Sequence, residues 1–429
     1  MNNKRLLNIG QDWASVVSAF LILLLVLVGG YSIKAPAFGP KSGIDGVGVL
    51  ISSFSEVSLV YGLGITLLVF LIVAVVGHYL SGSSLRSFLY GFVAIYLLAI
   101  VAQLCSSFAI FKDLGFETVL FSLVIGLAIG NFFRLPAWLL NAVQTELYVK
   151  IGLVLLGSTI LFGDVMQAGG VGLIQAAVVV VSVWYFAFWL AKKMKIDDEF
   201  STMLASAVSI CGVSAAIATA GAINGDKKKL SFIISLVLIV AIPMMVFMPI
   251  LAQWMGLTDE VTGAWLGGTI DTTGAVVGAG TIAGDTGLKY ATIIKFSQNV
   301  LLGIAAFLIS VFWAYRSRKG DSDISVESKK VSLRVIWERF PKFVLGFIVT
   351  SLIFSFSIDA ETAKSAGSIT KSMSTFWFNI SFICIGLETR FSDFRKIDSK
   401  KPLYAFLVAQ AFNVVLTLVV AWLLFDYFA

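Results

Sequence analysis

Apolar runs of about twenty residues recur along the whole chain. A helix needs roughly 20 apolar residues to cross the hydrocarbon core of a bilayer, and eleven runs come close to that length. The sequence therefore predicts an all-α polytopic membrane protein with about eleven transmembrane helices. The expected spans are 13–32, 57–79, 86–109, 115–133, 148–165, 170–191, 230–253, 287–316, 341–358, 370–389 and 403–427.

Two further segments, 200–224 and 261–284, are apolar but rich in small and polar residues. If 200–224 simply crossed the membrane, Lys227, Lys228 and Lys229 would lie outside, against the preference of basic residues for the cytoplasm. If each segment enters and returns, the lysines stay inside. The charge pattern therefore favours two re-entrant or broken helices that enter from opposite faces. Paired interrupted segments of this kind mark the binding sites of transporters.

The same charge rule orients the whole chain. Lys4 and Arg5 place the amino terminus in the cytoplasm, and alternation then puts the carboxyl terminus outside the cell membrane. We divide the chain into amino-terminal transmembrane helices (1–110), a transport region (111–315), a cytoplasmic linker (316–340) and carboxyl-terminal transmembrane helices (341–429).

A weak internal similarity suggests inverted repeats. Residues 151–164, IGLVLLGSTILFGD, resemble residues 380–393, ISFICIGLETRFSD. The orientation above makes the two segments antiparallel, as inverted repeats require. Chance similarity between two apolar helices is the alternative.

Composition narrows the functional classes. Charged residues make up only 13% of the chain, against about 25% in soluble domains, so the net charge of +6 reflects cytoplasmic lysine and arginine rather than nucleic-acid binding. One histidine and three scattered cysteines indicate neither a metal centre nor a disulfide framework. Phosphate-loop and hydrolase motifs are missing. We expect no enzymatic activity and no cofactor.

The first interrupted segment contains candidate substrate ligands. Broken helix ends expose unpaired N–H groups and a partial positive charge, which suit an anion. Close helix packing through small residues is the alternative. The candidates are Ser209, Cys211, Gly212 and Ser214.

The second interrupted segment surrounds a single acid, Asp271, with glycine and threonine. An ionisable group at membrane depth is costly enough to suggest function by itself. Asp271 is therefore expected to carry a coupling proton or a sodium ion, and its neighbours to bind substrate. These neighbours are Thr269, Thr272, Thr273 and Gly274.

Lys295 lies early in the next span, and Gln298 and Asn299 follow it closely. We expect Lys295 to meet the charge of an anion and to share the coupling role with Asp271, while the two amides orient the substrate. A structural salt bridge between Asp271 and Lys295 is the alternative, since a pair resolves the cost of burying either charge alone.

Three segments in order resemble a known family. They are SICGVSAAIA (209–218), GGTIDTTGAVVGAG (267–280) and ATIIKFSQNVLL (291–302), and together they are similar to the signature segments of the YeiH-like membrane family, whose members are described as candidate sulfate exporters. The resemblance covers roughly Val119 to the carboxyl end. It implies a secondary transporter with inverted repeats and broken helices. Many family members carry histidine followed by an acid where Ile270, Asp271 and Thr272 stand here, so Asp271 matches that histidine in position but not in chemistry.

These observations predict a secondary active transporter in the cell membrane that moves a small anion (sulfate, an organosulfonate or a carboxylate) by alternating access, in the direction of export. The expected partners are that anion, a coupling proton or sodium, the lipid bilayer and, as one option, a second copy in a homodimer. A cation-coupled exchanger of the sodium/proton type that uses Asp271 and Lys295 is the first alternative. An anion channel is the second.

Overall fold

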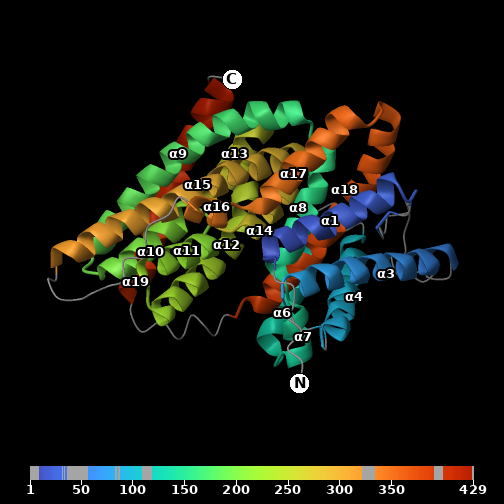
Figure 1. Ribbon diagram of the computed structural model, residues 1–429, viewed down its shortest axis with the longest axis horizontal. Coiled ribbons are helices and arrows are strands. Elements are labelled where there is room, and N and C mark those ends of the chain that lie inside the picture. Colours follow the sequence, from blue (N-terminus) through green and yellow to red (C-terminus); the bar gives the residue numbers. More distant parts are fainter. Residues whose placement is uncertain are drawn as a thin grey trace. The chain divides into compact units, whose positions relative to one another are not determined.

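The chain folds into packed helices in the computed structural model (Figure 1). The structure describes residues 9–30, 32, 34–35, 57–82, 85, 87–108, 118–320, 334–390 and 400–427. Residues 1–8, which include Lys4 and Arg5, and residues 321–333 of the expected linker lie outside this part of the chain.

The described helices fall into two compact units, each assembled from separate stretches of sequence. One unit contains 1–165 and 342–390, and the other contains 166–341 and 391–429. The first has the helices α1 (Gln11–Leu27), α3 (Val57–Leu80), α4 (Phe88–Ser106), α6 (Thr118–Phe132), α7 (Ala137–Ala142), α8 (Thr145–Leu156), η1 (Gly157–Thr159), α17 (Lys342–Leu352), η2 (Ile353–Ser357) and α18 (Ala360–Glu388). The second has nearly all of α9 (Phe162–Lys193), then α10 (Asp198–Ser209), α11 (Val213–Ile223), α12 (Lys227–Trp254), α13 (Asp259–Thr269), α14 (Thr273–Ile282), α15 (Gly284–Gly320), α16 (Arg334–Arg339), α19 (Lys400–Trp422) and η4 (Leu423–Tyr427). The four regions that we drew from sequence order were contiguous, whereas both units are discontinuous.

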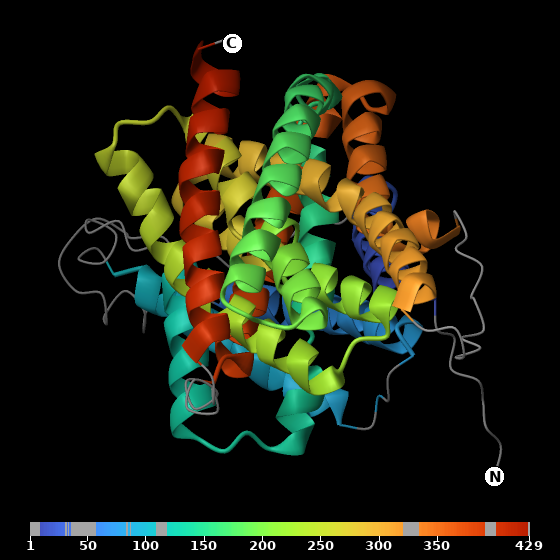
Figure 2. The same cartoon turned by 90° about the vertical axis from the view of Figure 1, so that its left-hand side faces the viewer.

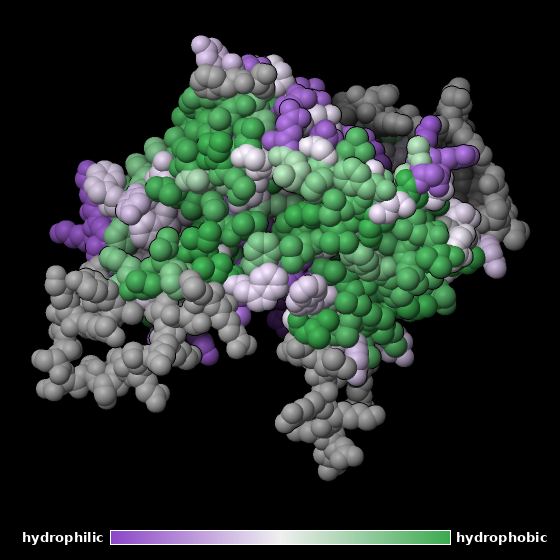
Figure 3. Space-filling model, turned by 45° about the horizontal axis from the view of Figure 1, so that its top comes forward, coloured by the Kyte–Doolittle hydropathy of each residue, from purple (hydrophilic) through white to green (hydrophobic). Residues whose placement is uncertain are grey.

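The helices have the length and surface of a membrane protein. Within the described residues, seven helical stretches are long and apolar enough to cross a bilayer. The other four expected spans correspond to α1, α6, α17 with η2, and α18, which are shorter or more polar, so the count of eleven is not reproduced by these criteria. Large apolar side chains such as Leu68, Val181 and Val415 are exposed, and broad apolar areas cover the face seen in Figure 3. Such surfaces suit lipid rather than water.

Aromatic side chains form the centre of the first unit. The Phe70 ring of α3 stacks on Trp377 of α18 with centroids 4.7 Å apart. Trp377 also lies 5.5 Å from the Tyr148 ring of α8. These side chains are fully buried, so they join three helices that are far apart in sequence.

Helices α8 and α18 run antiparallel within this unit. The Thr145 hydroxyl donates to Glu388 at 2.9 Å, and at the opposite end of the pair the Ser158 and Thr370 hydroxyls lie 2.6 Å apart. Between these contacts the Ser374 hydroxyl donates to the carbonyl of Gly152. Of the two segments with internal sequence similarity, residues 151–156 lie in α8 and residues 380–388 lie in α18, and these parts run in opposite directions. Residues 391–393 lie outside the part of the chain that the structure describes.

Helices α6 and α18 cross at two glycines. An added Cβ on Gly386 would lie 2.5 Å from the Leu127 backbone nitrogen and 2.6 Å from the Leu123 carbonyl oxygen. Gly126 is equally close to the backbone of α18 at Ile383. Backbones approach this closely in membrane helices only where side chains are absent.

We therefore expect Gly386→Ala to lower the free energy of unfolding by about 3 kcal/mol, the upper part of the range for overpacking a close contact. Backbone atoms face the new methyl group, so no side chain can move aside. The matched control is Gly64→Ala in α3, where nothing lies within 4 Å of the new Cβ. Unfolding of the purified variants by titration with a denaturing detergent measures both. Equal stability of the two variants would contradict the close crossing.

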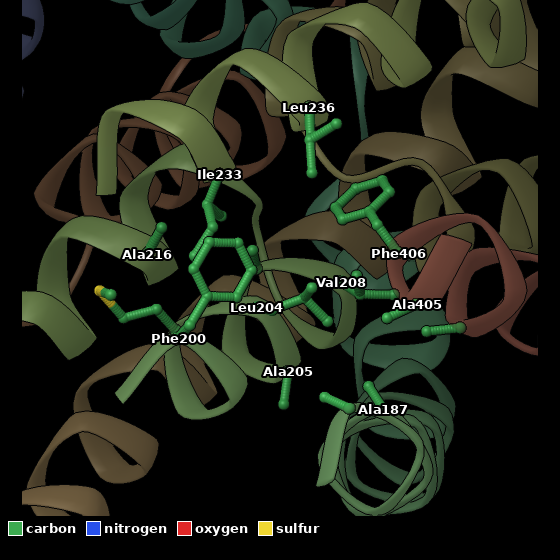
Figure 4. Packing of buried hydrophobic residues seen from close by; sticks show 14 of the residues in the cluster. Ala187, Phe200, Leu204, Ala205, Val208, Ala216, Ile233, Leu236, Ala405 and Phe406 are labelled. Atoms are coloured by element: carbon green, nitrogen blue, oxygen red, sulfur yellow. The ribbon is translucent and has the colours of Figure 1, made fainter. Parts of the chain in front are cut away.

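The second unit packs around α10 and α19. The Phe186 ring of α9 stacks on Phe412 of α19 at 4.1 Å, and Figure 2 shows these helices side by side. Phe200, Leu204 and Val208 of α10 point into a cluster that also takes Ile233 of α12 and Phe406 of α19 (Figure 4). This apolar packing fixes α10, the first half of the first interrupted segment.

Candidate functional site

The first interrupted segment is a helical hairpin. Helix α10 ends at Ser209, and α11 begins at Val213 after a break at Ile210, Cys211 and Gly212. Gly212 has φ 57° and ψ −105°, a conformation that is open to glycine alone. The two ends of the segment meet again, because the backbone N–H of Asp226, after α11, donates to Glu199 at the start of α10. The two ends of the segment therefore lie together, on the same side of the second unit.

Ion pairs hold the open end of this hairpin. The Lys229 ammonium lies 2.8 Å from Asp197 and 2.8 Å from Glu199. Partial burial raises the pKa of Asp197, but hydrogen bonds from Lys229 and from the N–H of Phe200 lower it by more, so the pKa lies below its ordinary value.

We expect Lys229→Ala to lower the free energy of unfolding at pH 7 by up to about 1 kcal/mol, since both acids are partly exposed and screened. Asp197 has a lowered pKa in the folded protein, so its contribution is present above the ordinary pKa of about 3.9 and is lost as the pH falls below it. Unfolding measured at pH 7 and pH 3 should show the difference between variant and parent shrinking at low pH. The matched control is Lys227→Ala. Lys227 is an exposed neighbour of Lys229 and forms no ion pair within the described residues. An equal effect of both variants would exclude this role for the pairs.

The second interrupted segment is also a hairpin. Helices α13 and α14 are separated by Ile270, Asp271 and Thr272, and the Thr272 hydroxyl caps α14 by accepting from the N–H of Ala275. Both open ends lie beside the start of α15: an added Cβ on Gly263 would be 2.7 Å from the Gly287 carbonyl oxygen, and one on Gly280 would be 2.9 Å from the Cα of Leu288.

The two hairpins enter the second unit from opposite ends. Helix α12 starts at the open end of the first hairpin, passes its tip where Val237 meets Gly212, and ends at Trp254, just before the second hairpin. Its 28 residues span about 42 Å, enough to cross a membrane. Helix α15 runs the other way. It starts at the open end of the second hairpin and reaches Gly303, which packs on α16. Arg339 of α16 in turn lies beside Gly221 of the first hairpin.

The tips of both hairpins meet at Lys295 of α15, which is 1% exposed. Its ammonium donates to the carbonyl oxygens of Ile210 at 2.7 Å and Ile270 at 2.8 Å, one from each break, and to the side-chain oxygen of Gln298 at 2.7 Å. All three hydrogens of the ammonium are therefore used. We call the two breaks together with Lys295 the hairpin junction.

Gln298 and Asn299 extend this pattern one turn further along α15. The Gln298 amide donates to the carbonyls of Ser209 at 2.9 Å and Gly268 at 3.2 Å, again one from each hairpin. Asn299 donates to the Thr273 hydroxyl at 3.3 Å. The last carbonyls of α10 and α13, which a helix end leaves unpaired, are thus bound by side chains of α15.

A stripe of α19 completes the set. Gln410 and Asn413 donate to the Thr269 carbonyl at 3.0 and 3.1 Å, and Asn413 also donates to Val208 of α10 at 3.2 Å. Thr417 donates to Asn413. We did not single out these residues from sequence. The available signal was buried polar residues at helical spacing, positions 410, 413 and 417, inside an apolar span.

Asp271 differs from every other group at the junction. It is 1% exposed, and neither carboxylate oxygen accepts a hydrogen bond of normal geometry from the described residues, although Gln410 and the Lys295 charge are near. It forms no direct ion pair with Lys295. An added Cβ on Gly212 would lie 3.2 Å from the Cβ of Asp271, so this side chain begins at the point where the two tips touch. A buried carboxylate without donors is costly.

The sequence profile of a family described as "Conserved hypothetical protein 698" matches residues 90–405. The chain belongs to this family. The match covers the hairpins, α15 and α18, and it supports the YeiH-like resemblance of the sequence segments at the junction.

Named relatives of this family are membrane proteins. "UPF0324 membrane protein RB9488" of Rhodopirellula baltica is 38% identical over 369 residues, which are 83% of this chain and 67% of the relative. A "UPF0324 membrane protein" of Nitratidesulfovibrio vulgaris is 35% identical over 82% of this chain and 62% of its own length. "UPF0324 membrane protein YdhF" of Lactococcus lactis is 27% identical over 79% of this chain and 99% of its own length. The chain thus spans about two thirds of the first two. No solved structure matches it.

The site residues predicted from the sequence differ in how deeply the structure buries them. Ser209, Cys211, Gly212, Thr269, Asp271, Gly274, Lys295, Gln298 and Asn299 are buried at the junction, whereas Thr272 and Thr273 are half-buried and Ser214 is exposed. Ser209 and Thr269 contribute their carbonyls rather than their hydroxyls to other helices. Among the described residues, no three His, Cys, Asp or Glu side chains are grouped as a metal site would need.

Proposed function

We propose that this protein is a secondary active transporter that exports a small anion across the cell membrane by alternating access. The observation that carries the proposal is the hairpin junction: two interrupted helices enter from opposite ends and meet at a buried lysine and aspartate. Membrane proteins tolerate irregular backbone at depth only where protein or a water-filled cavity surrounds it, and discontinuous helices form the substrate sites of transporters.

The anion would bind at the amino-terminal ends of α11 and α14. The first turn of each helix has N–H groups without intrahelical acceptors and a partial positive charge. Ser214 and Thr273 lie in these first turns and are accessible. The carboxyl-terminal ends of α10 and α13, whose carbonyls are bound by other helices, are buried. Lys295 has no hydrogen left to donate in this state, so it would attract the anion through space. Direct contact would require it to leave one carbonyl.

Orientation and energetics favour export. With the amino terminus in the cytoplasm, the ion-paired open end of the first hairpin faces inward. An inside-negative potential drives anions outward by about 2.3 kcal/mol per charge per 100 mV. Sulfate, organosulfonates and carboxylates share the negative oxygens that helix amino termini bind. We also propose that two copies of the chain assemble as a homodimer, and the transport mechanism does not depend on this assembly.

A cation-coupled exchanger is the second candidate, because one observation favours it. The Asp271 carboxylate has no hydrogen bond of normal geometry from the described residues, which suits a group that takes up and releases a cation. In that case no anion would bind at α11 and α14.

The test is a thermal-stability panel on the purified protein with sulfate, taurine and a dicarboxylate, at two pH values. An anion at 100 times its dissociation constant should stabilise the protein by about 2.7 kcal/mol. Ser214→Asp, which places a negative charge on α11, should remove this effect, and Ser365→Asp on the exposed start of α18 should not. Uptake by counterflow into preloaded liposomes then separates a transporter from a channel, because only a carrier exchanges anions. Stabilisation by pH or sodium alone would favour the exchanger.

A further inference from the structure

The ligands around Lys295 are those of a monovalent cation. Two backbone carbonyls from interrupted helices and one amide oxygen surround its nitrogen at 2.7–2.8 Å. Unwound carbonyls and helix carboxyl ends are the groups that coordinate sodium in transporters, and rings of carbonyls replace the hydration shell of potassium in channels. The Lys295 ammonium therefore donates to oxygens of the same kind as those that coordinate such ions.

The position is also electrostatically a cation site. Ile210 and Ile270 follow directly on the last turns of α10 and α13, where the helix dipole is negative and cations are favoured. The titratable groups that face Lys295 are Asp271 on the second tip and Cys211 on the first. The other groups that bind its nitrogen are backbone carbonyls and the neutral amide of Gln298.

We propose that the Lys295 ammonium is a tethered cation that occupies a built-in monovalent cation site between the two hairpins. The chain itself supplies the charge that a sodium ion would otherwise bring. The cation site itself does not depend on the proposed transport function, but one consequence rests on it. If the protein is a transporter, coupling at the junction is to protons, exchanged at Lys295 or Asp271, and not to sodium.

The site also explains how the two hairpins are held together. The ammonium is bound to one carbonyl from each tip, so the two tips separate only if a carbonyl loses its donor. A cation held in that place bridges them in the same way that a metal ion bridges two ligands. Loss of the proton from Lys295 leaves an amine with only two hydrogens for three acceptors, which weakens the bridge.

The test uses the purified full chain in detergent and measures thermal stability in chloride salts of sodium, potassium, ammonium and choline at constant ionic strength. The parent protein should melt at the same temperature in sodium as in choline, because its site is filled. Lys295→Ala opens the site and removes the charge. It should melt lower in choline and regain stability with sodium, potassium or ammonium in a saturable manner.

Two controls separate this outcome from a general salt effect. Lys295→Met also lacks the charge, but its side chain fills the space, so it should show no cation response. Lys289→Ala on the same helix removes a lysine that lies over the Tyr290 ring and should behave like the parent.

Two results would overturn the proposal. One is a folded Lys295→Ala protein that is indifferent to all three cations. The other is saturable stabilisation of the parent by sodium that disappears in Asp271→Asn. This second measurement tests the proposal even if Lys295→Ala does not fold. None of these measurements involves transport. If the parent protein transports no anion but Lys295→Ala responds to cations, the proposed function is rejected and the cation site is still supported.

Discussion

Asp271→Asn is expected to reduce anion flux by about 100-fold while the protein remains folded. The change keeps the shape of the side chain at the point where the two tips touch, but it removes the only carboxylate at the junction. Lys295 then loses the charge that balances it. The two groups form no direct ion pair, but removing one of two neighbouring buried charges leaves the other uncompensated. That costs about 3–5 kcal/mol for directly paired groups, and a cost near the lower end of this range corresponds to about 100-fold in flux. Counterflow in liposomes that contain equal amounts of folded protein measures it.

The matched control is Asp285→Asn, which neutralises an exposed carboxylate at the start of the same helix, α15, and should leave the flux unchanged. A double-mutant cycle with Lys295→Met tests whether the two charges interact. We expect the effects of Asp271→Asn and Lys295→Met on stability to be non-additive by about 0.5–3 kcal/mol, the range for coupled neighbours. Unchanged flux in Asp271→Asn, or full additivity, would remove Asp271 from the account.

Gly212→Ala is expected to destabilise the protein by about 3 kcal/mol and to abolish anion binding at the junction. Two penalties combine at this position. The backbone has φ 57° and ψ −105°, and forcing an alanine into such a conformation costs of order 1–3 kcal/mol. The new methyl group would also lie 2.6 Å from the Cγ1 of Val237 and 3.2 Å from the Cβ of Asp271, an overpacking that costs about 1–3 kcal/mol.

The two penalties can be separated by experiment. Val237→Ala removes the closest clash but not the strain of the backbone, so the double variant should recover part of the stability and no more. Gly170→Ala in α9 is the control, since nothing lies within 4 Å of its new Cβ. Detergent-induced unfolding of the parent, the Gly212→Ala and Val237→Ala variants, the double variant and Gly170→Ala gives the comparison. A Gly212→Ala protein as stable as Gly170→Ala would mean that the tips do not touch.

Much of the architecture could be predicted from sequence because membrane helices follow simple rules. The all-α membrane fold is confirmed. The segments 200–224 and 261–284 stood out because glycine and polar residues interrupt an otherwise apolar pattern, and both form hairpins. The lysines at 227–229 indicated that the first segment returns, since basic residues stay in the cytoplasm.

Other features depend on tertiary packing that sequence patterns do not contain. The partners of Lys295 are one example: its ammonium donates to Ile210 and Ile270, because the breaks bring two unpaired carbonyls to it. Sequence gives no sign of which carbonyls a buried lysine will reach. Gln410 and Asn413 are similar: they bind the ends of helices that lie about 140 and 200 positions away in sequence, as the separations of these hydrogen bonds show.

The central claim is that the two hairpins enter the membrane from opposite sides and meet at Lys295. Its most direct test is the sidedness of their open ends. In a protein whose Cys105, Cys211 and Cys384 are replaced by alanine, single cysteines are placed at Lys228, beside the first hairpin, and at Asp285, beside the second; both positions are exposed. A membrane-impermeant maleimide should label the Asp285→Cys protein in intact cells, and the Lys228→Cys protein only in inverted vesicles. Labelling of both from the same side would contradict the account.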